Sequence, residues 1–205
     1  MTIMPGGAED GAEDAAGDKA AWRASLLSAR VTLSPEDRAA AARSMRDAVL
    51  TRPEVEMAGS IAAYVSIGAE PDTSGLLFGL WKRGSYVLLP RLLPGGELDW
   101  ATYEGPDSLA PGPYGLLEPT AEPRGPRAVE AADVVLVPSL AVDRTGLRLG
   151  RGGGSYDRAL ARVGPQILTI GMVYDSEFVD ALPGEPHDRR VRAVVTPSGG
   201  FTRLS

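Results

Sequence analysis

Arginines, glycines and an acid are concentrated in residues 147–158, which read Leu-Arg-Leu-Gly-Arg-Gly-Gly-Gly-Ser-Tyr-Asp-Arg. Glycine lets the backbone adopt positive φ angles and approach a ligand closely, and backbone amides at a helix N-terminus attract anions. Arg148 and Arg151 can bind phosphate oxygens, and Asp157 can hold a Mg²⁺ ion that bridges such oxygens. The segment therefore predicts a phosphate-binding loop.

This loop matches neither of the two common phosphate motifs. The Walker A motif needs a lysine before Ser or Thr, and the sequence has no lysine after Trp100. The dinucleotide motif G-x-G-x-x-G also fails, because Ser155 stands where the third glycine would follow Gly150 and Gly152. A glycine cluster alone is most often a flexible turn, but the neighbouring arginines and Asp157 favour a ligand-binding role.

Predicted helices and strands alternate along the chain around this loop. Hydrophobic periodicity, capping residues and glycine or proline stops predict helices over 19–30, 35–52, 74–83, 155–163 and 177–182. Short apolar runs predict strands over 61–67, 86–90, 99–104, 134–137, 167–173 and 191–195. Residues 105–128 and 184–189 are predicted loops, and the apolar stretch 114–119 is expected to pack on the body of the protein. This alternation predicts a three-layer α/β fold with a mostly parallel sheet.

Composition predicts one domain preceded by an acidic leader. The chain has 205 residues, 43% of them hydrophobic, and a net charge of −6. Residues 1–18 contain five acids and no base, which leaves 22 acids against 21 bases in the rest of the chain. We therefore expect a disordered leader over 1–18 and a single domain over 19–205. A nearly neutral domain gives no support to nucleic-acid binding.

Other residue classes limit the chemistry further. The chain has no cysteine, which excludes disulfides, thiolate metal sites and a cysteine nucleophile. It has neither a basic and apolar signal segment nor a run of about 18 apolar residues. We therefore expect a cytoplasmic protein that does not act at a membrane.

Residues 137–158 resemble the signature of the 5-formyltetrahydrofolate cyclo-ligase family, also called 5,10-methenyltetrahydrofolate synthetases. The similarity extends over most of the chain, and the other matching positions are Lys19, Arg23, 64–66, 70–73, 115–119, 187–188 and 195–197. The resemblance implies a Rossmann-like fold of the NagB/RpiA/CoA-transferase-like type. It also implies a monomeric enzyme that uses ATP and Mg²⁺ to close 5-formyltetrahydrofolate to 5,10-methenyltetrahydrofolate, releasing ADP and phosphate.

The resemblance also implies a role for each matching residue. The implied catalytic residues are Arg148, Arg151 and Tyr156, and the implied metal ligands are Asp157 and Asp188. The ATP-binding set is Lys19, Arg23, Arg148, Gly150, Arg151, Gly152, Gly153, Gly154, Ser155 and Tyr156. The substrate-binding set is Val65, Glu70, Tyr114, Arg151, Gly152, Gly153, Gly154 and Ser155.

Two positions depart from the family pattern, and other interpretations remain open. Ser155 stands where the family usually has a second aromatic residue, and Gly153 where some members have lysine. A non-catalytic relative that binds folate or nucleotide is one alternative. A phosphosugar isomerase or acyl-transfer enzyme on a similar scaffold is another, and it would not require ATP. Lys19 with Arg23, Glu70, and His187 with Asp188 could also be ordinary surface residues.

Overall fold

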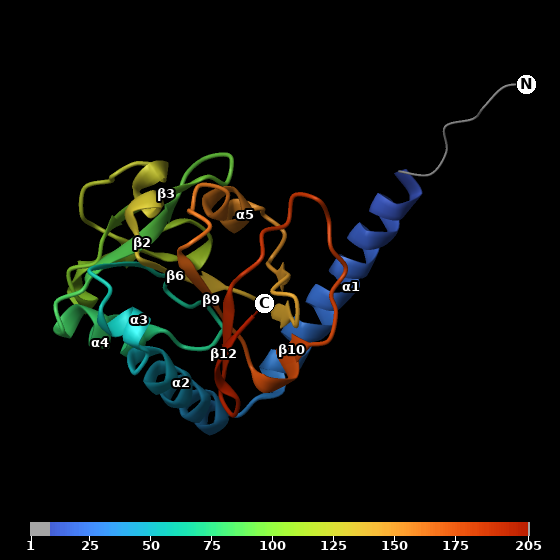
Figure 1. The fold of residues 1–205 in the computed structure, drawn as a ribbon, viewed down its shortest axis with the longest axis horizontal. Helices are drawn as coiled ribbons and strands as arrows, with labels where there is room; N and C mark the ends of the chain where they lie inside the picture. The colour runs from blue at the N-terminus through green and yellow to red at the C-terminus, as the bar shows by residue number, and fades with distance from the viewer. Residues whose placement is uncertain (1–8, 205) are drawn as a thin grey trace, which may run out of the picture.

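A seven-stranded sheet forms the centre of the computed structural model, which describes the backbone of residues 9–204 and side chains from residue 18 onward (Figure 1). The strand order is β12-β11-β9-β6-β1-β2-β3. The strands are β1 (Ser60–Ala62), β2 (Tyr86–Leu92), β3 (Leu98–Thr102), β6 (Val134–Pro138), β9 (Leu168–Met172), β11 (Ala193–Thr196) and β12 (Gly200–Arg203). The five inner strands run parallel, and β3 and β12 pair antiparallel at the two edges. The prediction of a mostly parallel sheet is confirmed.

Helices cover both faces of this sheet. Helices α2 (Pro35–Leu50), α3 (Pro53–Glu56) and α4 (Ser74–Lys82) pack on one face, and α5 (Ser155–Leu160) and the 3-10 helix η3 (Pro126–Ala131) pack on the other. Side chains along β6 alternate between the two cores, with Val134 and Leu136 on the first face and Val135 and Val137 on the second. A strand buried on both faces must be apolar throughout, which explains its sequence.

Helix α1 (Glu9–Thr32) lies along one side of the molecule beside the sheet, and its N-terminal turns extend past the body (Figure 1). Residues 9–18 of the expected leader belong to this helix and 1–8 lie outside the described residues, so a disordered leader over 1–18 stays a prediction. Alanine and glutamate in this segment favour helix, and a helix already formed at its packed end propagates with little further cost. The boundary of the single domain at residue 19 stays a prediction.

The local signals at the start of α2 act as the sequence predicts. Ser34 is the N-cap, and its hydroxyl accepts a hydrogen bond of 3.0 Å from the Asp37 amide. Pro35 occupies the first helical position, where its missing amide hydrogen is not needed. The capping residues therefore fix where this helix begins.

Several predicted bounds differ from the structure. The strand expected over 61–67 is confined to β1, and the residues after Ala62 turn away toward the cavity described below. The helix expected over 155–163 ends at Leu160, and the helix expected over 177–182 is absent from the described structure. That segment instead forms the 3-10 turn η4 (Asp175–Glu177) and strand β10 (Phe178–Val179). The expected surface loop 105–128 contains a small hairpin of β4 (Leu109–Pro111) and β5 (Leu117–Pro119).

A second, three-stranded sheet carries part of the glycine-arginine loop. It joins β10 to the hairpin of β7 (Ala141–Asp143) and β8 (Arg148–Leu149), which the sequence did not predict. The buried carboxylate of Asp143 holds the hairpin turn, because it accepts hydrogen bonds from the amides of Thr145 and Leu147. The turn fixes the position of Arg148, which begins β8.

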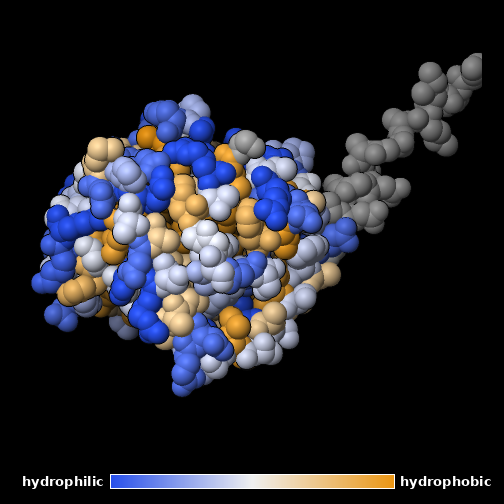
Figure 2. Space-filling model, turned by 60° about the horizontal axis from the view of Figure 1, so that its bottom comes forward, coloured by the Kyte–Doolittle hydropathy of each residue, from blue (hydrophilic) through white to orange (hydrophobic). Residues whose placement is uncertain are grey.

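The exposed surface is mixed in character. On the face shown in Figure 2, hydrophobic residues lie in small groups separated by hydrophilic ones, which is usual for the surface of a folded protein. Among the described residues, we find no helix that combines the length and the apolar character needed to cross a membrane.

Candidate active site

A cavity of about 460 Å³ opens at the carboxyl ends of the parallel strands, a volume in the range typical of small-molecule sites. All the site residues predicted from the sequence line this one cavity: Lys19, Arg23, Val65, Glu70, Tyr114, Arg148, Gly150, Arg151, Gly152, Gly153, Gly154, Ser155, Tyr156, Asp157 and Asp188. They come from segments as far apart in the sequence as α1 and the loop before β11. The fold therefore brings the whole predicted set together.

Helix α1 supplies a row of cations along one face. Lys19, Arg23 and Arg30 recur at helical spacing, and each contacts a different part of the protein body. The Arg23 Nε atom donates to the Gly150 carbonyl oxygen at 2.9 Å, which places its guanidinium beside the glycine loop. Lys19 and Arg23 therefore reach the cavity together, as their spacing predicts.

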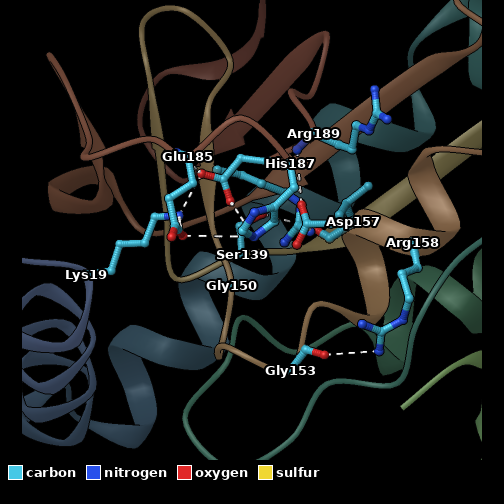
Figure 3. A network of polar contacts seen from close by, with 12 residues as sticks. Lys19, Ser139, Gly150, Gly153, Asp157, Arg158, Glu185, His187 and Arg189 are labelled. Atoms are coloured by element: carbon cyan, nitrogen blue, oxygen red, sulfur yellow. Dashed lines mark hydrogen bonds and ion pairs between the residues drawn. The ribbon is translucent and has the colours of Figure 1, made fainter. Parts of the chain in front are cut away.

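The glycine loop adopts backbone conformations that require glycine. Gly152 has a φ angle of +100° and Gly154 a φ angle of +66°, both in the region that side chains disfavour. Arg158 of α5 stabilises the loop, because its guanidinium donates to the Gly153 carbonyl oxygen at 3.1 Å (Figure 3). It also donates to the Gly96 carbonyl oxygen at 2.7 Å. The loop is thus held open around the cavity by its own helix.

Arg148 and Asp157 form a buried ion pair at the cavity wall. The Arg148 Nη2 atom lies 3.0 Å from Asp157 Oδ1, which also accepts a hydrogen bond from the Arg189 amide. Burial lowers the pKa of Arg148, while the nearby Asp157 opposes that shift, and an arginine remains charged in any case. The Arg148 Nε atom is buried without a hydrogen-bond partner in the described structure. A ligand oxygen in the cavity would satisfy this cation further.

A second ion pair spans the cavity between the loop after β1 and the glycine loop. The half-exposed Arg151 donates through Nε to Glu70 Oε1 at 3.0 Å, and the other Glu70 oxygen accepts from the Ile67 amide at 2.9 Å. Each carboxylate oxygen has a second lone pair, so Glu70 keeps acceptor capacity toward a ligand. Glu70 therefore lines the cavity with a fixed carboxylate, and its role in substrate binding stays a prediction.

Lys19 contacts two carboxylates on the loop 184–189. Its Nζ atom lies 2.5 Å from Glu185 Oε2 and 2.6 Å from Asp188 Oδ2, and in Figure 3 Lys19 points toward this loop. Burial alone would lower the pKa of Lys19, but the hydrogen bonds to Asp188 and Glu185 outweigh it and raise the pKa. Burial tends to raise the pKa of Asp188, yet the hydrogen bonds from Lys19 and the Glu185 amide lower it. Both groups are therefore charged near neutral pH.

Glu185 is a site residue that the sequence analysis missed. It lies two positions before His187, and the two residues with Asp188 place one ligand atom each within 4.8 Å of one another. The short distance in sequence between Glu185 and the His187-Asp188 pair was the one signal that could have indicated this residue. Sequence spacing alone could not show that Glu185 would face Lys19 of α1.

The carboxylates here fit a divalent cation such as Mg²⁺. In the described structure Asp188 accepts hydrogen bonds through Oδ2 and Asp157 through Oδ1, so each has a second oxygen that accepts none. His187 Nε2 lies 4.0 Å from the second oxygen of Asp188. Magnesium in proteins is usually bound by one or two carboxylates together with substrate phosphates. The donor set thus matches the ion that the family resemblance implies.

The remaining cavity wall is aromatic and apolar. The hydroxyl of Tyr156 is buried without a hydrogen-bond partner in the described structure, and burial raises its pKa far above the usual range, so it stays protonated. Apolar lining comes from Pro90, Leu92, Leu98, Leu116 and Leu117. Tyr114 lines the mouth from the 3-10 turn η2 (Pro113–Gly115), with a φ of +55° and a side chain 89% exposed. The cavity is therefore lined by apolar and aromatic side chains as well as by cations.

The stretch 114–119 meets the expectation of packing only in its second half. Pro119 is buried, and Glu118 accepts a hydrogen bond from the Leu92 amide at 2.8 Å, which joins β5 to β2. Tyr114 and Leu117 are exposed, because they border the open cavity rather than the core. Their apolar character therefore suits a ligand more than a packing partner within the chain.

If the cavity binds ATP as the family resemblance implies, replacing Gly153 by lysine is expected to tighten that binding. A Cβ atom at Gly153 would meet only the Ser155 hydroxyl, at an ordinary 3.6 Å, so a side chain fits there. The added ammonium would enter the cavity beside Arg151, and one charge-assisted contact worth about 1 kcal/mol corresponds to a KM for ATP lower by about three- to tenfold. Steady-state kinetics measure this. Gly153→Met has a similar length without charge, and an equal fall in its KM would contradict the electrostatic reason.

The fold and the site together define a class of protein. Three-layer α/β proteins with parallel sheets bind small ligands at the carboxyl ends of their strands, and this cavity adds a cluster of cations suited to phosphate. The class is therefore that of α/β proteins that bind an anionic small molecule.

The chain belongs to the 5-formyltetrahydrofolate cyclo-ligase family, whose model matches residues 15–197. The 5-formyltetrahydrofolate cyclo-ligase of Mycolicibacterium smegmatis is 41% identical over 71% of this chain and 77% of the relative. The enzyme of the same name from Escherichia coli K12 is 34% identical over 82% of this chain and 94% of the relative. The recognition made from residues 137–158 is confirmed.

Solved structures agree with this assignment. The NMR structure of Aquifex aeolicus 5,10-methenyltetrahydrofolate synthetase superposes with a TM-score of 0.79 at 30% identity, covering 91% of this chain and 92% of that one. A 5,10-methenyltetrahydrofolate synthetase from Mycoplasma pneumoniae has a TM-score of 0.69 at 20% identity, covering 86% of this chain and 97% of that one, and shows the same fold. The predicted fold class is confirmed.

Proposed function

We propose that this protein converts 5-formyltetrahydrofolate and ATP to 5,10-methenyltetrahydrofolate, ADP and phosphate. The observation that carries the proposal is one cavity that is lined both by a cluster of cations and by apolar side chains. Such a cavity suits a reaction between a polyanion and a flat, largely apolar heterocycle. Family membership supplies the substrate class.

The chemistry explains why ATP is needed. A formamide carbon is a poor electrophile, and its oxygen is a poor leaving group. When the formyl oxygen attacks the γ-phosphorus, the bond to the β–γ bridging oxygen breaks and ADP leaves. The N10 lone pair then attacks the activated carbon, the C–O bond breaks, and phosphate departs with the former formyl oxygen as N10 loses its proton. No covalent bond to the protein is required.

The protein's task is to position two substrates and to stabilise phosphoryl charge. Arg148 and Arg151 line the cavity beside Asp157 and Glu70, and Lys19 and Arg23 approach from α1. Because Arg148 is buried, its charge acts in a region of low dielectric, where it is worth more than in water. We assign the ATP phosphates to this cluster of cations.

We assign Mg²⁺ to Asp157 and Asp188, with Glu185 as a further candidate ligand. When bound, the ion would supply positive charge to the phosphate oxygens. Asp157 is oriented by hydrogen bonds from Arg148 and from the Arg189 amide, at 3.0 and 3.1 Å. The orientation of this carboxylate is thus set by the chain itself.

We assign the folate to Val65, Glu70, Tyr114 and the loop 151–155. The Glu70 carboxylate is fixed by Ile67 and Arg151 and can accept hydrogen bonds from the amino-pyrimidine edge of the pterin. Tyr114 stands at the mouth, where it can cover the ligand. Ser155 leaves room where an aromatic would narrow the site. A cytoplasmic location and a monomeric state remain predictions.

The direct test follows the absorbance of the methenyl product while 5-formyltetrahydrofolate, ATP and Mg²⁺ are supplied together and then withheld one at a time. We expect product only when all three are present. Product without ATP would favour an acyl-transfer or isomerase chemistry on this scaffold. Tight folate binding without product or ADP would instead favour a non-catalytic binding protein, the alternative that Ser155 raises.

A further inference from the structure

The ammonium of Lys19 lies where a metal ion would be expected to neutralise the carboxylates of Glu185 and Asp188. Its ammonium contacts one oxygen of Glu185 and one of Asp188, at 2.5 and 2.6 Å, and only 4% of the residue is exposed. The same two acids, with His187, form the group whose ligand atoms converge within 4.8 Å. The protein thus already places a cation of its own between two candidate metal ligands.

This arrangement relieves a repulsion. Two carboxylates that converge in a partly buried place disfavour each other's ionised state unless a cation lies between them. Lys19 supplies that cation, because its ammonium contacts both carboxylates. The loop 184–189 is therefore held against α1 by this pair of contacts.

Lys19 also lies within reach of a second kind of partner. Arg23, one helical turn further along α1, has its guanidinium against Gly150 and Gly152 of the glycine loop, and Lys19 lines the same cavity. A lysine side chain is a flexible four-carbon stem with a compact charge, so a small rotation about its bonds can change its partner. A phosphate at the glycine loop would offer the ammonium a partner as negative as the two carboxylates.

We propose that Lys19 is an exchangeable counter-ion, which neutralises Glu185 and Asp188 in the empty protein and moves to the nucleotide phosphates when a divalent cation takes these carboxylates. The proposal rests on the proposed function, because it needs a nucleotide in this cavity. A divalent cation alone must displace Lys19 without giving it a new partner, whereas nucleotide and cation together satisfy every charge. Nucleotide and metal must therefore strengthen each other's binding, since such coupling is reciprocal.

The test measures Mn²⁺ binding to the nucleotide-free protein, by the loss of the free-ion electron paramagnetic resonance signal. Lys19→Met removes the resident cation but keeps much of the side-chain length, and we expect it to bind Mn²⁺ about tenfold or more tightly than the unmodified protein. Binding of a non-hydrolysable ATP analogue without metal should weaken in the same variant. Lys82→Met is the matched control, since Lys82 is the only other lysine and its ammonium lies over Trp81, 4.7 Å from the ring centre.

An affinity for Mn²⁺ that is unchanged or weaker in Lys19→Met would overturn the proposal. Should that variant fail to fold, as thermal melting would reveal, Lys19→Gln keeps a hydrogen-bond donor without the charge and is expected to show the same tightening. These binding measurements involve no turnover. They therefore test the exchange of Lys19, whereas the methenyl assay tests the proposed function. If the unmodified protein forms the methenyl product but Lys19→Met binds Mn²⁺ with unchanged affinity, the exchange proposal is rejected and the proposed function stands.

Discussion

Replacing Arg148 by alanine is expected to lower kcat by about 10³-fold or more, the range found when an arginine that contacts a transferring phosphoryl group is removed. Arg148 is 5% exposed and lines the cavity with a buried Nε atom that has no partner in the described structure. Its removal takes away transition-state charge and also one of the two contacts that orient Asp157. Steady-state kinetics of methenyl formation, with a melting curve of each variant, measure the effect.

Two further variants separate charge from geometry. Arg148→Lys keeps the charge but loses the planar fork, and we expect it to recover only a small part of the rate. Arg127→Ala removes an exposed arginine that pairs with Glu130 on η3, outside the cavity, and should turn over normally. If a folded Arg148→Ala variant retained more than about a tenth of the normal kcat, the assignment of Arg148 to phosphoryl transfer would be wrong.

The second large effect concerns stability and involves the buried pair of Arg30 and Glu177. Arg30 donates to Glu177 at 2.6 and 2.8 Å and to the Ser139 carbonyl oxygen at 2.7 Å, and both charged residues are almost fully buried. Burial alone would lower the pKa of Arg30, but Glu177 raises it. Arg30→Met leaves the Glu177 charge uncompensated, so we expect the free energy of unfolding to fall by about 3–5 kcal/mol. Denaturant titration followed by circular dichroism measures this.

A paired variant tests the reason for that loss. Glu177 also accepts a hydrogen bond from the Tyr174 amide at 2.8 Å. The side-chain oxygen of a glutamine at this position can accept the same hydrogen bond without carrying a charge. The double variant Arg30→Met with Glu177→Gln should therefore recover much of the stability, because no unpaired charge remains buried. A double variant as unstable as the single one would mean that packing of the arginine stem, rather than charge, explains the loss.

The main sheet and its order of helices and strands could be predicted because their signals are local. Apolar runs such as 134–137 are long enough to indicate a strand by themselves, and Ser34 with Pro35 marks the start of a helix. Strands β7, β8 and β10 were missed because each has only two or three residues and depends on pairing with a distant partner. Strand β12 has four residues and was also missed, because it is fixed by its antiparallel pairing with β11.

The site was accessible from the sequence chiefly through the family resemblance. Composition and spacing indicate a phosphate loop at 147–158 but cannot place Lys19 and Glu70 against it. Their partners, Asp188 and Arg151, lie far along the chain and meet them only in the folded protein. Glu185 was missed for the same reason, since its importance comes from an ion pair with a helix at the other end of the sequence.

The separation of these partners along the chain affects how the protein is made. Lys19 and Asp188 are 169 residues apart, and the contact between Arg30 and Glu177 spans 147 residues. During synthesis α1 emerges before the residues that it contacts, and Lys19 meets its partners Glu185 and Asp188 only after 166 and 169 further residues. A nascent chain can therefore build much of its sheet before the cavity is complete, and the wall formed by Glu185 and Asp188 assembles only after β9 has emerged.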